Sequence, residues 1–249
     1  MSRTATTFGN QCLMEKGNRI IFALIALACV VVNSRAFALV PSCPEVVVPL
    51  SALLMPPPEQ NSIQTKAELQ ELFRLQASRT STQVTHAKSD DRRTIERFLD
   101  GMGVKIGNLS ISTNYFFDCI ADSVERAVRE AKVTFMRTRP YRLPHSGLHT
   151  LKKLSDRDSS SYPSGHATYG AVVGLVLAEM LPEKKEKIYE RIQDYANSRL
   201  LLGAHFRSDI YAGEIAGAAI AVTLFKNEMF LAEFKEVSDE LRKSMGIEP

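Results

Sequence analysis

The sequence predicts an all-α protein, folded as a compact helical bundle. In several long segments apolar residues recur every three or four positions, which is the spacing of one helix face. No segment shows the strict alternation of a half-buried strand, and there is no internal repeat. The 249 residues are enough for one fair-sized domain or two small ones, and the composition is that of an ordinary folded protein.

The N-terminal segment, residues 1–38, has the features of a secretory signal peptide. Two basic residues precede the apolar run from Ile20 to Val32, and Ala36-Phe37-Ala38 forms a small-residue cleavage pattern. An apolar run of thirteen residues is short for a membrane span, although an uncleaved N-terminal anchor is the alternative. Whether translation begins at Met1 or Met14 is left open.

The mature chain, residues 39–249, is expected to be a single domain without net charge. The predicted signal peptide contains four of the 31 basic residues and one of the 28 acidic residues, so 27 of each sign remain after cleavage. No basic block with interleaved aromatic residues is present. Nucleic acid is therefore not an expected partner.

Residues 39–62 are rich in proline and lack periodicity, which predicts an extended arm across the surface. Arg139-Pro140, Pro182 and Gly203 are expected to end three of the helices that follow. Residues 141–162 are expected to be a loop. Helices are predicted over Lys66–Ser78, Asp90–Met102, Tyr115–Met136, Ala167–Leu181, Glu183–Leu202 and Asp209–Lys226.

Two of these segments, residues 167–181 and 211–225, are apolar enough to raise the question of a membrane. Both are shorter than eighteen residues and each contains a glutamate. Buried core helices of a soluble bundle are therefore the favoured interpretation, with no membrane span expected after the signal peptide.

Cys43 and Cys119 are the cysteines that remain after signal cleavage. In an oxidising compartment they could pair as a disulfide. Equally, Cys119 could be a small buried hydrophobic residue on a helix. The sequence does not distinguish these alternatives.

The stretch SSYPSGHATYG, residues 160–170, joins a turn of small residues to the start of an apolar helix. Backbone N–H groups point outward at a helix N-terminus, so Ser164 and Gly165 can offer donors to an anion there. His166 can move protons near neutral pH. The stretch predicts a phosphate-like ligand and acid–base chemistry.

Further candidates lie near the other helix ends. Asp209 follows His205 by four residues, so it can hold one ring nitrogen and leave the other free as a nucleophile. Lys132, Arg139 and Arg199 supply three positive charges for phosphate oxygens. These residues predict in-line displacement at phosphorus.

In that scheme His205 attacks phosphorus and His166 protonates the leaving alcohol. Water activated by His166 then releases phosphate. The cations of the protein take the place of a metal, so neither a metal nor another cofactor is expected.

Three segments, KVTFMRTRP, YPSGH and SRLLLGAHFRSD, together carry the pattern K-x6-RP, PSGH, SR-x5-H-x3-D with all eleven fixed positions matched. The chain thereby resembles the type 2 phosphatidic acid phosphatase superfamily, which includes vanadium haloperoxidases. Within it, the signal peptide, the PPP segment and the longer SYPSGH form are similar to those of the bacterial class A non-specific acid phosphatases. The resemblance covers nearly all of residues 50–225.

The resemblance implies an all-α fold, a phosphohistidine intermediate and activity on many phosphomonoesters at acidic pH, in a secreted or periplasmic enzyme. It carries over phosphate contacts to Lys132, Arg139, Ser164, Gly165 and Arg199, and catalytic roles to His166, His205 and Asp209.

Other members of the superfamily suggest a vanadate-dependent haloperoxidase or a lipid phosphatase as alternatives. A phosphate-binding protein without catalysis is a third. The physiological substrate, the ratio of phosphotransfer to hydrolysis and any homo-oligomer are left open. Five residues are given no role in the site, the surface histidines His86, His145 and His149 and the arginines Arg137 and Arg207.

Overall fold

The structure is a computed structural model, and it describes residues 43, 46–100, 102, 109–144, 146–152 and 160–247. The predicted signal peptide, residues 1–38, lies outside the described residues, as do His145 and residues 153–159 of the predicted loop. The division of the chain at residue 38 stays a prediction.

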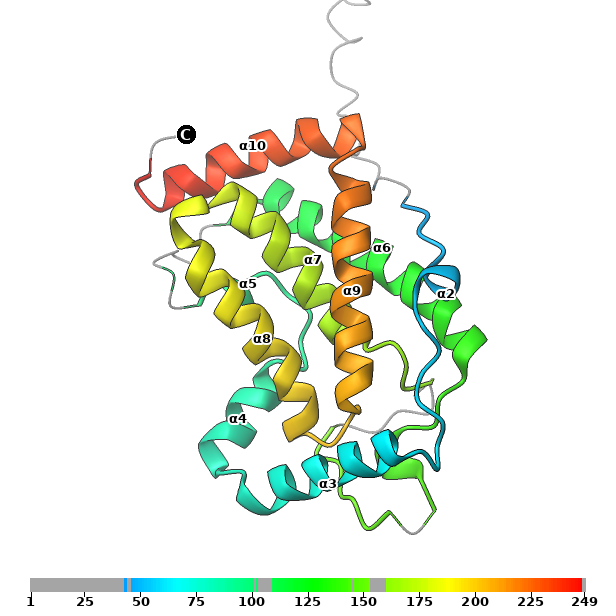
Figure 1. Ribbon diagram of the computed structural model, residues 1–249. Coiled ribbons are helices and arrows are strands. Elements are labelled where there is room, and N and C mark those ends of the chain that lie inside the picture. Colours follow the sequence, from blue (N-terminus) through cyan, green and yellow to red (C-terminus); the bar gives the residue numbers. More distant parts are fainter. Residues whose placement is uncertain are drawn as a thin grey trace, which may run out of the picture. The chain divides into compact units, whose positions relative to one another are not determined.

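Every regular element in the described ranges is helical, which confirms the all-α prediction (Figure 1). Single turns are found at α2 (Leu50–Leu53), α5 (Glu96–Leu99), and the 3-10 turns η2 (Pro140–Arg142) and η3 (Pro182–Lys184). The longer helices are α3 (Ile63–Ser78), α4 (Ser81–Ser89), α6 (Ile111–Phe135), α7 (Gly165–Met180), α8 (Lys185–Leu201), α9 (Arg207–Leu224) and α10 (Glu228–Ser244).

Helix α7 forms the centre of the bundle. It lies between α8 and α9 and also packs on α6 (Figure 1). Nearly all of its side chains are buried, which explains why its sequence is apolar on every face. Its N-terminus carries the PSGH turn, so the buried position of α7 fixes where that turn lies.

Helices α7 and α9 are in backbone contact near their N-termini because two positions of α9 lack a Cβ atom. A Cβ at Gly213 would lie 2.7 Å from the carbonyl oxygen of Ser164. A Cβ at Gly217 would lie 2.5 Å from the Cβ of Ala171. These distances are too short for any side chain, so the two glycines permit the close packing.

Helix α6 matches the predicted helix at 115–136, beginning four residues earlier at Ile111. Its predicted apolar face is buried. However, Pro140 does not end it. The helix ends at Phe135, and Met136 adopts the left-handed conformation (φ 45°) while its N–H bonds to the carbonyl of Lys132. The chain therefore turns away from the helix axis before it reaches Arg139.

The predicted helix over residues 90–102 is wrong. Helix α4, which the apolar spacing did not indicate, ends at Ser89, and α5 then provides one helical turn. Between them Asp90 is fully buried, where its carboxylate accepts hydrogen bonds from Arg97, Arg191 and Ser198. These bonds hold residues 90–94 in a turn rather than a helix.

Side chains cap the N-termini of α4 and α10. Thr80 and Gln83 form a reciprocal capping box at the start of α4, and Asn227 caps α10. Helix α10 was not predicted from the sequence.

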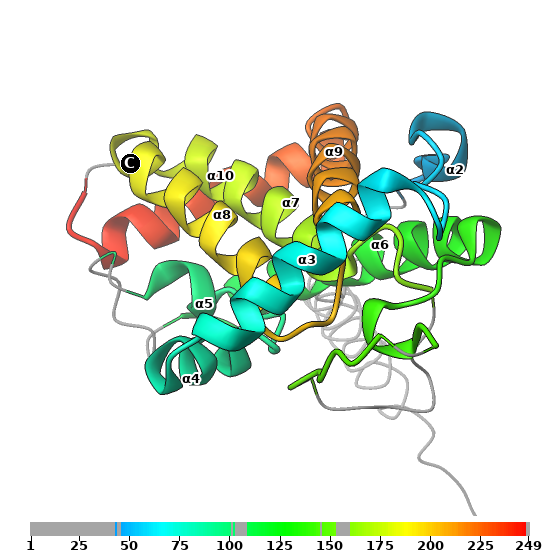
Figure 2. The same ribbon diagram turned by 60° about the horizontal axis from the view of Figure 1, so that its bottom comes forward.

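Helices α3 and α4 lie at the end of the bundle where α8 ends and α9 begins (Figure 2).

The remaining helix boundaries agree with their signals. Gly203 has a left-handed backbone (φ 67°) directly after α8, as expected for a glycine that ends a helix. Pro182 follows α7 and begins η3. Asp209 lies in the first turn of α9. In the described residues no single helix is long and apolar enough to cross a membrane, while α9 and α10 together, bent by 97°, pass that test of length and composition.

Cys43 and Cys119 form a disulfide, which decides between the two alternatives that the sequence left open. The bond joins the N-terminal segment to the buried face of α6 across 76 positions of sequence. A cross-link over so long a loop restricts the unfolded chain considerably.

Loss of this disulfide is expected to lower the free energy of unfolding by about 2–4 kcal/mol. Cys43→Ala, Cys119→Ala and the double variant should lose nearly the same amount in denaturant titrations, because either single change already breaks the bond. Losses that add up in the double variant would show that the two sulfurs act independently.

Candidate active site

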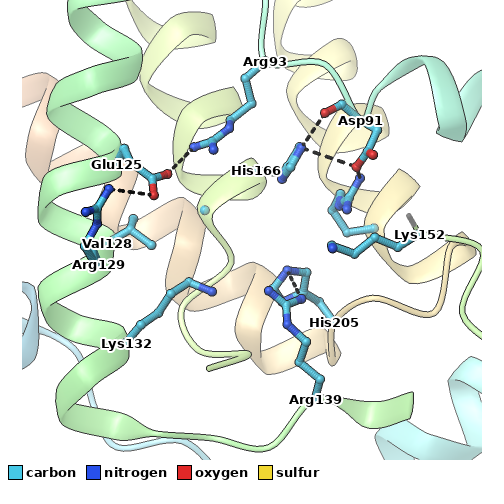
Figure 3. Close-up of a pocket in the computed structure, with 12 residues that line it drawn as sticks. Asp91, Arg93, Glu125, Val128, Arg129, Lys132, Arg139, Lys152, His166 and His205 are labelled. Atoms are coloured by element: carbon cyan, nitrogen blue, oxygen red, sulfur yellow. Dashed lines mark hydrogen bonds and ion pairs between the residues drawn. The ribbon is translucent and has the colours of Figure 1, made fainter. Parts of the chain in front are cut away.

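A pocket of about 310 Å³ opens where the N-termini of α7 and α9 meet α6 and α8 (Figure 3). Six of the eight predicted site residues line it, and the other two, Ser164 and Asp209, are fully buried outside the lining. The described lining residues are Asp91, Arg93, Glu125, Val128, Arg129, Lys132, Arg139, Lys152, Gly165, His166, Arg199 and His205.

His205 is held from behind by Asp209, as the spacing of four predicted. The Nδ1 atom of His205 lies 3.3 Å from Oδ2 of Asp209, and the same oxygen accepts the backbone N–H of Phe206 at 2.8 Å. Because Nδ1 faces a carboxylate, it carries the proton, and Nε2 is left with its lone pair.

The Nε2 atom of His205 lies 3.1 Å from a guanidinium nitrogen of Arg139, which also donates to the carbonyl of Ala204 at 3.0 Å. Burial, and after it the positive charge of Arg139, lowers the pKa of His205 to about 3. His205 is therefore neutral, and its Nε2 unprotonated, through the whole moderately acidic range.

Asp209 is fully buried and accepts from four groups in all. A guanidinium nitrogen of Arg137 lies 2.6 Å from Oδ1, and the hydroxyl of Ser161 donates to Oδ2. Burial alone would raise the pKa of Asp209, but the hydrogen bond from His205 and the charge of Arg137 outweigh it and lower the pKa to about 2. The carboxylate stays ionised.

Arg137 was given no role from the sequence, yet it is at the centre of a buried ionic network. Besides Asp209 it pairs with Glu68 of α3 at 3.2 Å and donates to the hydroxyl of Ser208 at 2.7 Å. Its guanidinium also stacks over the ring of Phe206, 4.1 Å from the centroid. The network links α3, the segment after α6 and the start of α9. Arg207, by contrast, pairs with Glu71 away from the pocket.

His166 stands across the pocket from His205. Its Nε2 donates to the backbone carbonyl of Asp91 at 3.1 Å, and its ring stacks on that of Tyr195. Nδ1 of His166 is then the basic nitrogen. Burial, and after it the charge of Arg199, holds the pKa of His166 well below its usual value.

Arg199 is fully buried in the wall of the pocket. One guanidinium nitrogen donates to the carboxylate of Asp91 at 2.9 Å. Its Nε and its second terminal nitrogen have no hydrogen-bond partner among the described residues. Buried donors without partners are costly, so this guanidinium is suited to an anion in the pocket.

Lys132 reaches into the pocket from α6, and its ammonium donates to the backbone carbonyl of Ser160. Burial, followed by the charge of Arg139, lowers the pKa of Lys132 to about 7. Both causes disfavour the charged form of the ammonium, and burial is the larger of the two.

Ser164 stabilises the start of α7, and its predicted phosphate contact stays a prediction. Its side chain is fully buried and caps α7 through the N–H of Ala167, while its own N–H donates to the carbonyl of Asp209. Ser164 therefore fixes the PSGH turn against α9. The next residue, Gly165, lines the pocket as expected at the first position of α7.

The turn after α4 contributes two residues that the sequence analysis missed, Asp91 and Arg93. Asp91 contacts both His166 and Arg199, and Arg93 pairs with Glu125 of α6 at 2.8 Å (Figure 3). Both residues lie in the segment 90–102, which was predicted to be a helix, and charged residues on a helix do not indicate a site by themselves. Of the three histidines without a role, His86 pairs with Asp90 and Asp194, and His149 is exposed.

Comparison with known proteins agrees with the family that the motifs indicated. The sequence model of the PAP2 superfamily matches residues 108–230. The non-specific acid phosphatase of Salmonella typhimurium is 30% identical over 205 residues, which covers 80% of this chain and 82% of that protein. The non-specific acid phosphatase of Providencia stuartii is 35% identical over 127 residues, 50% of each chain.

A solved structure, the transmembrane PAP2-type phosphatidylglycerolphosphate phosphatase of Bacillus subtilis, is similar with a TM-score of 0.47 and 18% identity, covering 70% of this chain and 87% of that one. Because the Salmonella typhimurium relative is 30% identical and is matched over most of its length, this chain belongs to the PAP2 superfamily and to its family of non-specific acid phosphatases.

Proposed function

We propose that this protein is a metal-independent acid phosphatase that hydrolyses a broad range of phosphomonoesters through a phosphohistidine intermediate. The observation that carries the proposal is the pairing of an oriented, unprotonated His205 with a wall of cations, in which two guanidinium nitrogens of Arg199 have no partner among the described residues. The names of the relatives support the same activity.

In the first step the phosphoryl group lies between His205 and His166. Nε2 of His205 attacks phosphorus while the bond to the ester oxygen breaks, and His166 gives its proton to the leaving alcohol. Lys132, Arg139 and Arg199 bind the equatorial oxygens, where charge is spread in the transition state. Asp209 keeps the proton on Nδ1 and stabilises the positive charge that the ring acquires.

In the second step His166 acts as the base. Its Nδ1 takes a proton from water, the water oxygen attacks phosphorus, and the P–N bond to His205 breaks to release inorganic phosphate. A second alcohol in place of water would give phosphotransfer instead. Both steps use the same cations, which supply the charge stabilisation that a metal ion gives in other phosphatases.

The test is hydrolysis of p-nitrophenyl phosphate near pH 5–6 with excess EDTA. Turnover should survive the chelator, and acid-labile, alkali-stable phosphate should be trapped on the protein when the reaction is quenched. Loss of activity to EDTA, restored by a divalent metal, would contradict the proposed chemistry. A folded protein that binds phosphate without turnover would support a binding function instead.

An acidic pH optimum is expected from the charges of the pocket. Below the His205 pKa of about 3 the nucleophile is protonated, so kcat/KM falls on the acid side. Burial and the charge of Arg199 hold the pKa of free His166 well below its usual value, so we propose that the phosphate monoanion, whose own pKa is about 6, supplies the proton that His166 passes to the leaving alcohol. As pH rises through about 7, Lys132 also loses its charge.

The expected kcat/KM profile is therefore a bell, with a plateau between roughly pH 4 and 6 and a fall above it. It can be measured from pH 3 to 9 at constant ionic strength. A flat profile across this range would contradict the use of two histidines.

We further propose a secreted or periplasmic location. The predicted signal peptide and the disulfide between Cys43 and Cys119 support an oxidising compartment. Small phosphomonoesters are the proposed substrates, and self-association stays a prediction. Sequencing the N-terminus of the secreted protein would test cleavage after Ala38.

A further inference from the structure

The pocket contains a second group of cations in addition to those that the proposed mechanism uses. Arg93, Arg129 and Lys152 all line it, although none belongs to the three-part motif. In Figure 3, Arg93 and Arg129 lie on the α6 side with Glu125 between them, and Lys152 lies on the opposite wall beyond His166. Arg93 and Arg129 form the outer cation group.

The charges of the described lining residues separate into two sets, and each set has more cations than carboxylates. The inner set has three cations, Lys132, Arg139 and Arg199, against the carboxylate of Asp91. The outer set, on the α6 side, has Arg93 and Arg129 against the carboxylate of Glu125. One phosphate dianion would therefore be balanced by the inner set alone, and a positive excess would remain in the outer set.

The outer cations keep access to solvent, in contrast to the buried inner set. The side chain of Arg129 is 71% exposed and that of Arg93 is 32% exposed, whereas Arg199 is fully buried. Glu125 bridges the two arginines, at 2.8 Å from Arg93 and 3.5 Å from Arg129. One carboxylate shared by two guanidinium groups leaves donors for a further anion.

The field of Arg93 also extends into the inner pocket. Its charge contributes to the lowered pKa of both Lys132 and His166. An anion bound beside Arg93 would weaken that effect and help His166 to hold the proton that the leaving group needs.

We infer that the outer cation group is a binding site for a second phosphate, so that the preferred substrates are bisphosphates, with one phosphate at His205 and the other held by the remaining donors of Arg93 and Arg129. This inference rests on the proposed phosphatase activity. The outer site confers preference by binding, and monophosphates remain substrates because the inner set is complete without it.

The test uses straight-chain propanediol, butanediol and hexanediol, each with a phosphate on one or on both terminal hydroxyls. The carbon chains carry no other polar group that the protein could bind. Their different lengths test which separation of the two phosphates fits the two sites best. At low ionic strength and pH 6, kcat/KM for the best bisphosphate should exceed that of its monophosphate by about tenfold. Two equivalent ester bonds would alone give a factor of two.

Arg129→Gln and Arg93→Gln should each bring the ratio of bisphosphate to monophosphate kcat/KM close to two. Arg126→Gln is the matched control, because Arg126 is exposed on the same helix, α6, carries the same charge and does not line the pocket. The control should keep the wild-type ratio.

The outcomes separate the two proposals. Hydrolysis of monophosphates with a ratio of two in the wild type would overturn the second site and leave the phosphatase proposal standing. If Arg126→Gln lowered the ratio by the same amount, the second site would also be overturned. The preference for bisphosphates would then come from a general attraction to the positive charge of α6. Hydrolysis of neither substrate by the folded protein would overturn the proposed function itself.

Discussion

Replacing His205 by alanine is expected to lower kcat for phosphomonoester hydrolysis by about 10⁴-fold. The variant loses the only nitrogen that the proposed mechanism brings to phosphorus, while the cations that bind the phosphoryl group stay in place. Phosphate binding should therefore persist although turnover is lost. Steady-state kinetics and a phosphate titration monitored by calorimetry measure the two effects separately.

His149→Ala provides the control for this prediction. His149 is exposed and does not line the pocket, so its removal should leave kcat and KM as they are. The trapped phosphoprotein should also disappear in His205→Ala and remain in His149→Ala. Retention of the trapped phosphate in His205→Ala would mean that a different residue is the nucleophile.

The second large effect is expected at Arg137, a residue outside the motif. Arg137→Gln removes the partner of two buried carboxylates, Glu68 and Asp209. Leaving buried charges unpaired typically costs about 3–5 kcal/mol of unfolding free energy. For a protein of this size the midpoint of thermal unfolding should fall by about 10 °C.

A catalytic effect should accompany the loss of stability in Arg137→Gln. Without Arg137 the pKa of Asp209 should rise, so Asp209 should become protonated at a higher pH. A protonated Asp209 no longer orients His205, and the acid limb of the kcat/KM profile should therefore move to higher pH. Arg137→Lys should restore part of both properties because it keeps the charge but not the fork of the guanidinium.

Arg207→Gln is the matched comparison, because Arg207 is a neighbouring arginine that pairs with Glu71 in a partly exposed position. Its loss should cost less than about 1 kcal/mol and leave the pH profile unchanged. Equal effects of the two variants would show that the buried network around Asp209 has no special importance.

The sequence predicted most of the helices that build the site because their signals are local. Each of these signals lies within a single helix or at its end. The apolar spacing of residues 115–136 and 167–181 predicted α6 and α7, and the glycine at 203 predicted the end of α8. The predicted helix over residues 90–102 was wrong because Arg191 and Ser198, about a hundred residues later, bind Asp90.

The site residues that the sequence predicted make local contacts, whereas those it missed make contacts with residues far away along the chain. His205 and Asp209 are four residues apart, so their contact can be deduced from helical geometry alone. Arg137 meets Asp209 and Glu68 only through folding, 72 and 69 positions away along the chain. Asp91 likewise reaches Arg199 across 108 positions, so no pattern in the local sequence could reveal it.

The glycines at 213 and 217 have a consequence for the cost of catalysis. Because α7 and α9 touch through their backbones, the separation of the two helix starts is set by stiff main-chain contact rather than by side chains that can change rotamer. In the proposed mechanism, Gly165 and His205, which line the pocket at these two helix starts, are thus arranged before any substrate arrives. Little reorganisation energy is left to be supplied during the reaction, and the barrier is lower by that amount.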